Sequence, residues 1–303
     1  MLAKMFIEKK FKEYYSKSKI KLPKDFEKRE FAFVPFSSLP EFIMHRHLAF
    51  KSEEDFQSYV LKNLPAHVYY SSAYYENPAE TSMDKKGWLA ADLVFDIDAD
   101  HLPLKIKSIE SSLKMAKREV KKLLTILKRD FGINEEDTKV YFSGGRGYHI
   151  HVTSEDFLEL GSAERREIVD YLTINNPDLR LDSTIRRRIE AYVKRFSSTI
   201  EVAIEKLRVY VDAPVTADTK RLIRMPGTLH GKTGLAVVEV EDVEIFDPLS
   251  DAVVFGDEEV SVRVLKKVTV RIKDVNVRAK PGDVIKVPEY AAIFLLCRGL
   301  ATY

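Results

Sequence analysis

The sequence is poor in cysteine, and it has neither a long apolar run nor an excess of charge of one sign. Cys297 is the only cysteine among the 303 residues, which excludes an internal disulfide and any zinc or iron–sulfur site built from several cysteines of this chain. We therefore expect a reducing, intracellular setting. Lys and Arg number 49 and Asp and Glu 47, so the net charge alone does not indicate a protein that binds nucleic acid.

Membrane and targeting segments are also missing. No apolar stretch is long enough to cross a bilayer, and Met1–Lys10 lacks the apolar run that a signal peptide needs. The content of 45% hydrophobic and 32% charged residues is typical of a soluble globular protein. Because repeats, low-complexity tracts and Gly/Ser linkers are absent too, we expect a single domain over residues 1–303.

Hydrophobic spacing and turn residues predict an α+β chain, a mixed sheet flanked by helices. Ser52 and Asp55 form a capping box before a helix that Pro65 ends, and Ser108 precedes a long basic helix that Gly132 ends. A helical insertion is expected at about 155–207 and a β-rich part at about 208–303, beginning with the β-like run Arg208–Val211. Further helices are expected at Phe6–Tyr15 and Tyr290–Leu300, and strands at Arg29–Phe36, Val68–Tyr75, Lys139–Ser143, Tyr148–Val152, Leu235–Val240, Val260–Ile272 and Val284–Val287.

Two aspartates stand on one face of an apolar strand within the stretch Ala90–His101. Strand side chains alternate, so Asp96 and Asp98 leave the same face, about 6–7 Å apart along the chain. Two carboxylates in an apolar setting repel each other and lose solvation, and a divalent cation relieves both costs. Oxygen ligands of this kind suit Mg²⁺ or Mn²⁺. A motif this short also occurs where two acids only end a strand and face water.

A glycine-rich turn, Ser143-Gly144-Gly145-Arg146-Gly147, joins two of the expected strands. Its glycines let the backbone approach a ligand closely. The N–H groups of the turn, the Ser143 hydroxyl and the Arg146 guanidinium together suit phosphate oxygens. His149 and His151 share one face of the following strand, so His149 can meet the same ligand. The alternative is a tight hairpin in which the glycines supply positive φ and Arg146 is solvated.

A third group of residues begins at Asp212, which follows the β-like run and can supply another carboxylate. Beyond it, a basic cluster surrounds the turn Pro226-Gly227. Its members are Lys220, Arg221, Arg224, His230 and Lys232. Such a cluster would neutralise a triphosphate, although basic surface loops are common. The three groups together match two-metal nucleotidyl transfer, in which one ion activates a 3′-hydroxyl and the other holds the triphosphate.

With these residues, the chain resembles the catalytic (small) subunit of the archaeal and eukaryotic type of DNA primase. The resembling segments run through the whole chain. They are Arg29–Phe33, Arg46–Phe50, Asp96–Asp98, Ser143–His149, the block from Asp212 through Arg224 to His230, and the tail from Val287 to Ala301. An ordered set of this kind is far more specific than any one motif.

The resemblance implies a primase-polymerase fold, with a mixed or antiparallel sheet as catalytic core, that makes short RNA or DNA primers de novo on single-stranded DNA. It implies Asp96, Asp98 and Asp212 as ligands of two Mg²⁺ or Mn²⁺ ions. It implies that the phosphates of the incoming nucleotide are bound by Ser143, Gly144, Arg146, Gly147, His149, Arg224, His230 and Lys232. The expected partners are a primase large subunit, the template, the growing primer, and NTPs or dNTPs. The expected place is the cytoplasm, at the nucleoid.

One departure from the family concerns zinc. The family typically carries a small Cys/His zinc-binding element after the DxD strand, but Leu102–Ser112 contains neither residue, so we expect no zinc. The span from Asp98 to Asp212 is also short for the family, which indicates a trimmed helical part, in a compact natural member or an engineered minimal core.

Three alternatives stay open on the sequence. A repair or gap-filling primase-polymerase would use the same site. A haloacid-dehalogenase-like phosphohydrolase could use Asp96 as a nucleophile, but Asp100 occupies the position where that family needs Thr or Val. A non-catalytic nucleic-acid-binding subunit would leave the three carboxylates without a role.

Overall fold

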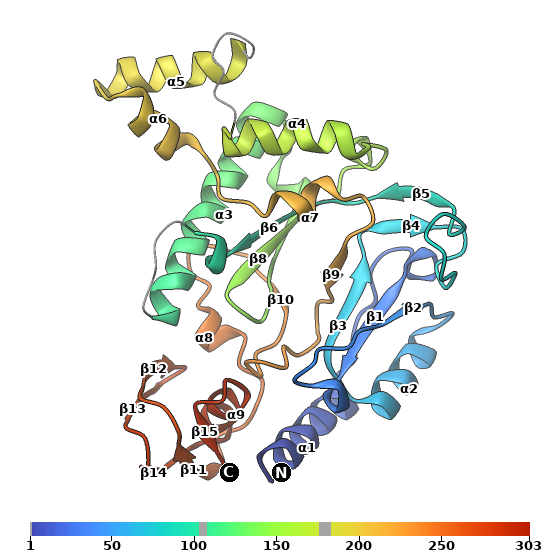
Figure 1. The fold of residues 1–303 in the computed structure, drawn as a ribbon, viewed down its shortest axis with the longest axis vertical. Coiled ribbons are helices and arrows are strands. Elements are labelled where there is room, and N and C mark those ends of the chain that lie inside the picture. The colour runs from blue at the N-terminus through green and yellow to red at the C-terminus, as the bar shows by residue number, and fades with distance from the viewer. Residues whose placement is uncertain (1, 103–107, 176–182) are drawn as a thin grey trace.

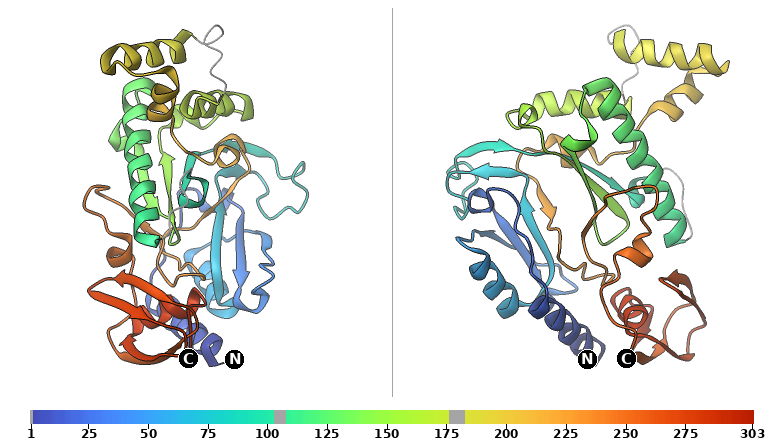
Figure 2. Two further views of the ribbon diagram at one scale, coloured as in Figure 1. Left: turned by 60° about the vertical axis from the view of Figure 1, so that its left-hand side comes forward. Right: turned by 180° about the vertical axis from the view of Figure 1, so that it is seen from behind.

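The computed structural model describes residues 2–102, 108–175 and 183–303, and these form an α+β fold, as predicted (Figure 1). Two four-stranded sheets stand side by side, with helices on their outer faces (Figures 1 and 2). A three-stranded sheet and two two-stranded sheets complete the β structure in the described residues. Neighbouring strands are antiparallel in the pairings of both large sheets.

The first large sheet has the strand order β2-β1-β3-β9. Phe31 pairs with Tyr70 and Phe33 with Val68, which places aromatic side chains on the face that helix α2 covers. Phe56 of α2 packs there, 5.6 Å from Phe31 between ring centroids. The elements are α1 (Leu2–Lys17), β1 (Phe31–Pro35), β2 (His45–Leu48), α2 (Glu53–Asn63), β3 (Pro65–Ser71) and β9 (Leu222–Arg224).

The second large sheet has the strand order β10-β7-β8-β6. Phe95 pairs with Ile150, and the apolar face that they share packs on helix α3, whose Val120 and Leu123 are buried. Strand alternation turns Asp96 and Asp98 to the opposite face, toward the first sheet. The elements are β6 (Leu93–Asp98), α3 (Ile109–Phe131), β7 (Thr138–Phe142), β8 (Gly147–Val152) and β10 (Val238–Glu239).

The remaining elements form a helical part, a C-terminal part and connections. Helices α5 and α6 share a small hydrophobic cluster of their own and project from the top of the molecule in Figure 1. Both chain ends lie together at the bottom. The elements are β4 (Ala73–Tyr75), β5 (Trp88–Ala91), α4 (Ser162–Thr173), α5 (Ser183–Phe196), α6 (Ile200–Leu207), α7 (Ala213–Ala217), α8 (Pro248–Asp251), β11 (Glu259–Val264), β12 (Val268–Ile272), β13 (Val275–Ala279), β14 (Val284–Pro288), α9 (Glu289–Cys297) and β15 (Ala301–Thr302).

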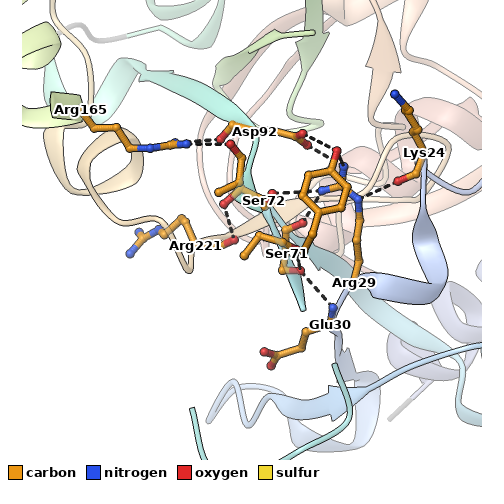
Figure 3. A network of polar contacts seen from close by, with 11 residues as sticks. Lys24, Arg29, Glu30, Ser71, Ser72, Asp92, Arg165 and Arg221 are labelled. Atoms are coloured by element: carbon orange, nitrogen blue, oxygen red, sulfur yellow. Dashed lines mark hydrogen bonds and ion pairs between the residues drawn. The ribbon is translucent and has the colours of Figure 1, made fainter. Parts of the chain in front are cut away.

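A buried polar network joins the two large sheets at the root of β6 (Figure 3). Arg29, only 2% exposed, forms an ion pair of 2.8 Å with Asp92, and the guanidinium of Arg165 donates to the Asp92 carbonyl at 2.9 Å. The amide of Ser72 donates to the Arg221 carbonyl at 2.8 Å. Because Arg29 and Arg165, which are distant in sequence, both bind Asp92, the network fixes where β6 begins.

Several predicted elements are confirmed, with their caps. The Ser52 hydroxyl accepts from the amide of Asp55, the Ser108 hydroxyl accepts from the amide of Ser111, and Gly132 ends α3 with a φ of 70°. The stretch Asn175-Asn176-Pro177, whose composition indicates a break between helices of the insertion, lies partly outside the described residues.

Three strand predictions are wrong. Val68–Tyr75 is two strands of different sheets, because the Ser72 amide turns away from the ladder to bond Arg221. Val260–Ile272 is also two strands, β11 and β12, and the amide of Leu265 between them bonds the Leu300 carbonyl instead. Arg208–Val211 lies in no strand. Each case depends on a partner that is distant in sequence.

Candidate active site

The strand pair β6 and β8 forms the centre of the site. Asp96 pairs with His149 and Asp98 with Gly147, so both aspartates face the same side as the imidazole. His149 Nε2 lies 3.7 Å from Asp96 Oδ1, longer than a hydrogen bond. A Cβ atom at Gly147 would lie 2.5 Å from the carbonyl oxygen of Ile97, so only glycine lets β8 approach Asp98 this closely.

Asp212 is brought to these aspartates from far along the chain. Its backbone amide donates to the carbonyl oxygen of Asp96 at 2.8 Å, and it occupies the N-cap position of α7. Its side chain is 18% exposed, and Oδ2 lies 4.0 Å from His101 Nδ1. The sequence predicted Asp212 after a strand, but it follows an extended segment that crosses the edge of β6.

The three carboxylates repel one another. Burial and the negative charges of Asp98 and Asp212 raise the pKa of Asp96 to about 7, against the opposing charges of Arg224 and Arg221. Near neutral pH, protonation of Asp96 relieves part of this repulsion. A bound divalent cation would relieve it instead of the proton, so the three carboxylates fit a cation site.

In the part of the chain that the structure describes, no three His, Cys, Asp or Glu side chains converge into a ready-made metal cage. The donor set nevertheless fits Mg²⁺, because this ion commonly keeps several waters and uses one or two carboxylates together with substrate phosphates.

The glycine-rich turn forms one wall beside the carboxylates. Gly144 has a φ of 74°, and a Cβ there would lie 2.8 Å from the Cβ of His230. Thr233 Oγ1 donates to the Gly144 carbonyl at 2.5 Å, and the amide of Ser143 donates to the Gly147 carbonyl at 3.0 Å. The Ser143 bond closes the turn, and the Thr233 bond fixes the turn to the segment that carries His230.

Arg146 points from this turn toward Asp100, with which it forms an ion pair. The amide of Asp100 also donates to Asp98 Oδ1 at 2.9 Å. Through these two contacts Asp100 links the DxD strand to Arg146. The pair is exposed, with side-chain exposures of 41% for Arg146 and 52% for Asp100.

A second wall carries Arg224, on strand β9, and His230, where this wall meets the glycine-rich turn. Arg224 Nη1 lies 2.6 Å from Nδ1 of His67, and the rings of His67 and His230 meet edge to face at 4.9 Å. Burial, with the charges of Arg224 and Lys232, lowers the pKa of His67 to about 2. Burial likewise lowers the pKa of His149 to about 3. At neutral pH these imidazoles are therefore uncharged hydrogen-bonding groups.

A cleft of about 550 Å³ collects most of the predicted residues, and this volume suits a small-molecule site. The predicted residues that line it are Asp96, Asp98, Ser143, Arg146, His149, Arg224, His230 and Lys232. Asp212, Gly144 and Gly147 are not among its lining residues. Sequence reasoning missed Tyr69, Thr233 and Arg298 as lining residues, and it missed His67 behind Arg224. His67 was only one of several scattered histidines, so no local signal distinguished it.

His151, which shares the face of His149, lines a different cavity of about 700 Å³. Its ring lies among those of Tyr70 and Tyr141, at 6.4 and 5.0 Å.

Comparison with known proteins identifies the family. A sequence model described as DNA primase small subunit matches residues 95–242. The DNA primase small subunit PriS of Archaeoglobus fulgidus is 54% identical, over 100% of this chain and 99% of that protein. The chain belongs to the DNA primase small subunit family. The PriS protein of Methanosarcina barkeri is 36% identical over 98% of this chain and 96% of that protein.

Membership of the primase family makes the chain a nucleotidyltransferase of DNA replication, and it decides against the phosphohydrolase alternative. The alignment with the Methanosarcina barkeri protein extends over 398 residues against 303 here, so that primase subunit has segments without a counterpart in this chain.

Among solved structures, the polymerase domain of Mycobacterium tuberculosis ligase D in complex with DNA matches 80% of this chain and 83% of that chain. The TM-score is 0.47 and the identity 12%.

In the described residues of this primase subunit, no helix is both long and apolar enough to cross a membrane.

Proposed function

We propose that the cleft between the two large sheets joins nucleotides into short RNA or DNA primers, starting de novo on single-stranded DNA during replication. The observation that carries the proposal is the hydrogen bond from the Asp212 amide to the Asp96 carbonyl. It brings a third carboxylate to the DxD strand, directly beside a wall of cationic side chains. Nucleotidyl transfer needs both groups next to each other.

Asp96, Asp98 and Asp212 would hold two Mg²⁺ or Mn²⁺ ions. When bound, such ions supply activation of the attacking hydroxyl and charge stabilisation at the triphosphate. The carboxylates of this chain contribute the negative charge and the oxygen atoms that hold them. The repulsion that raises the pKa of Asp96 supports this role, because a bound cation removes it. No zinc is included in the proposal, since the chain has one cysteine.

The two walls of the cleft would bind the phosphates of the incoming nucleotide. On one wall Ser143, Gly144 and Gly147 offer backbone and hydroxyl donors, and Arg146 offers its guanidinium. On the other, Arg224 and Lys232 supply positive charge. His149 and His230 are neutral, because burial lowers the pKa of each, so they would donate single hydrogen bonds. In this proposal the cationic side chains neutralise the charge of the phosphates, and the two neutral histidines orient them.

The partners that we propose are the single-stranded template, the growing primer, NTPs or dNTPs, and a primase large subunit. A large subunit would supply the iron–sulfur domain of the family, for which this chain lacks the cysteines. We propose that residues 1–303 act as one domain, in the cytoplasm at the nucleoid.

The test uses the purified chain with unprimed single-stranded DNA, labelled nucleotides and Mg²⁺ or Mn²⁺. We expect labelled oligomers from the parent and from Glu258→Gln, which changes an exposed acid outside the cleft, and none from Asp96→Ala. Extension of a supplied primer without de novo products would assign initiation to a partner. Equal synthesis by parent and Asp96→Ala would contradict the proposed metal site.

A further inference from the structure

Arg298, which lies in the C-terminal segment Val287–Ala301, lines the same cleft as Arg146. It follows the buried helix α9, whose end is held by backbone hydrogen bonds from residues 298 to 300. The Arg298 amide donates to the Phe294 carbonyl at 3.1 Å, and the Leu300 amide donates to the Leu295 carbonyl at 2.9 Å. Gly299 takes a φ of 63° and turns the chain out of the helix. The backbone of Arg298 is therefore fixed at the cleft.

In the part of the chain that the structure describes, the guanidinium of Arg298 has no carboxylate partner in an ion pair. Across residues 2–102, 108–175 and 183–303, no Asp or Glu oxygen forms an ion pair with it, and its only aromatic neighbour is Phe294, one turn back on its own helix at 5.6 Å. Burial and the positive charge of Arg146 lower the pKa of Arg298, and the Asp100 charge opposes them. Asp100, whose negative charge acts on Arg298, is already paired with Arg146, and all three residues line the same cleft.

Arg146 and Arg298 carry like charges in one cleft, and the single carboxylate near them, Asp100, is paired with Arg146, so binding of a further anion in the cleft would be favourable. Planar guanidinium groups bind phosphate oxygens in fixed geometry, with charge-assisted hydrogen bonds. We propose that Arg298 and Arg146 form a phosphate subsite of the cleft, in addition to the wall of Arg224 and His230. The assignment rests on the proposed function, because it takes its phosphate from a substrate of that reaction.

The phosphate has two possible sources, the triphosphate of a nucleotide and the sugar–phosphate backbone of DNA. The experiment compares the parent chain with Arg298→Gln, which removes the charge but keeps a polar side chain, and with Arg298→Lys. Arg278→Gln is the matched control, because Arg278 is exposed on strand β13, distant from the cleft-lining residues. ATP, ADP and AMP are titrated calorimetrically with Mg²⁺ and without DNA, and oligothymidylate binding is measured at two salt concentrations.

We expect Arg298→Gln to raise the Kd of ATP about tenfold and to leave that of AMP nearly unchanged, with Arg298→Lys in between. A weaker oligothymidylate complex with a shallower salt dependence, and unchanged ATP binding, would place a DNA phosphate in the subsite instead. Unchanged binding of both ligands by a variant that melts at the parent temperature would overturn the proposal. These titrations need no turnover, so their outcome is independent of whether Asp96→Ala abolishes synthesis.

Discussion

Nδ1 of His67 lies 2.6 Å from Nη1 of Arg224, two residues that are far apart in the sequence. Arginine can only donate, so Nδ1 must accept and the proton of the ring must sit on Nε2. Burial keeps the imidazole neutral, with a pKa lowered to about 2. His67 is fully buried, so it acts as a fixed acceptor that holds the Arg224 side chain along the cleft wall.

We propose that His67 acts through Arg224 and does not contact the substrate itself. Replacing His67 should therefore weaken nucleotide binding indirectly. We expect His67→Ala to raise the nucleotide KM about tenfold with a smaller change in kcat, because Arg224 loses its orientation. His67→Asn places an amide oxygen near the position of Nδ1 and should restore most of the affinity. His45→Ala, at an exposed histidine of β2, is the control. An unchanged KM in His67→Ala would refute this positioning role.

The raised pKa of Asp96 predicts how stability depends on pH without metal. Between 3.8, the ordinary value, and about 7, the folded state keeps a proton that the unfolded state has lost, so stability falls as pH rises through this window. Asp96→Asn has no carboxyl group at this position to titrate, so its stability should not fall for this reason as pH rises. In EDTA we expect its unfolding free energy, relative to the parent, to increase by roughly 2–4 kcal/mol from pH 4 to 7 and then to level off.

Urea unfolding at a series of pH values measures this difference. Glu258→Gln should follow the parent at every pH. Added Mg²⁺ should raise the unfolding midpoint of the parent at pH 7.5 and have a much smaller effect on Asp96→Asn. Parallel pH curves for parent and Asp96→Asn would show that Asp96 does not titrate in this window.

Arg146 and its partner Asp100 can be separated by mutation. We expect Arg146→Ala to raise the nucleotide KM about tenfold or more, because a charged phosphate donor is lost, and to leave the melting temperature nearly unchanged, since the ion pair is exposed. Asp100→Asn breaks the same ion pair but keeps the guanidinium, so its KM should not rise. Steady-state kinetics on a primed template distinguishes the two. Equal increases in both variants would mean that the ion pair itself matters.

Gly147 is predicted to be intolerant of a methyl group. A Cβ there would lie 2.5 Å from the Ile97 carbonyl oxygen, so Gly147→Ala must push β8 away from β6. We expect a loss of about 1–3 kcal/mol in stability, together with loss of synthesis. Gly256→Ala is the control, since its Cβ would approach nothing closer than 3.9 Å. Denaturant midpoints measure both. A Gly147→Ala chain as stable as the control would contradict the close approach of the strands.

Local patterns in the sequence were enough to predict the parts of this primase subunit whose contacts are local. The caps at Ser52 and Ser108 bond amides within three residues, and the alternation of β6 puts Asp96 and Asp98 on one face wherever the strand lies. The glycine-rich turn was recognisable for the same reason. The roles of these residues stay predictions until the variants are measured.

Only the tertiary structure decided which distant segments meet at the cleft. Asp212 reaches Asp96 by one backbone hydrogen bond, His67 supports Arg224 from another strand, and Arg298 arrives from the C-terminal helix. The break between β3 and β4 at Ser72 depends on the Arg221 carbonyl in the same way. Such contacts are selected by the packing of two sheets and a buried ionic network, and no local periodicity encodes them.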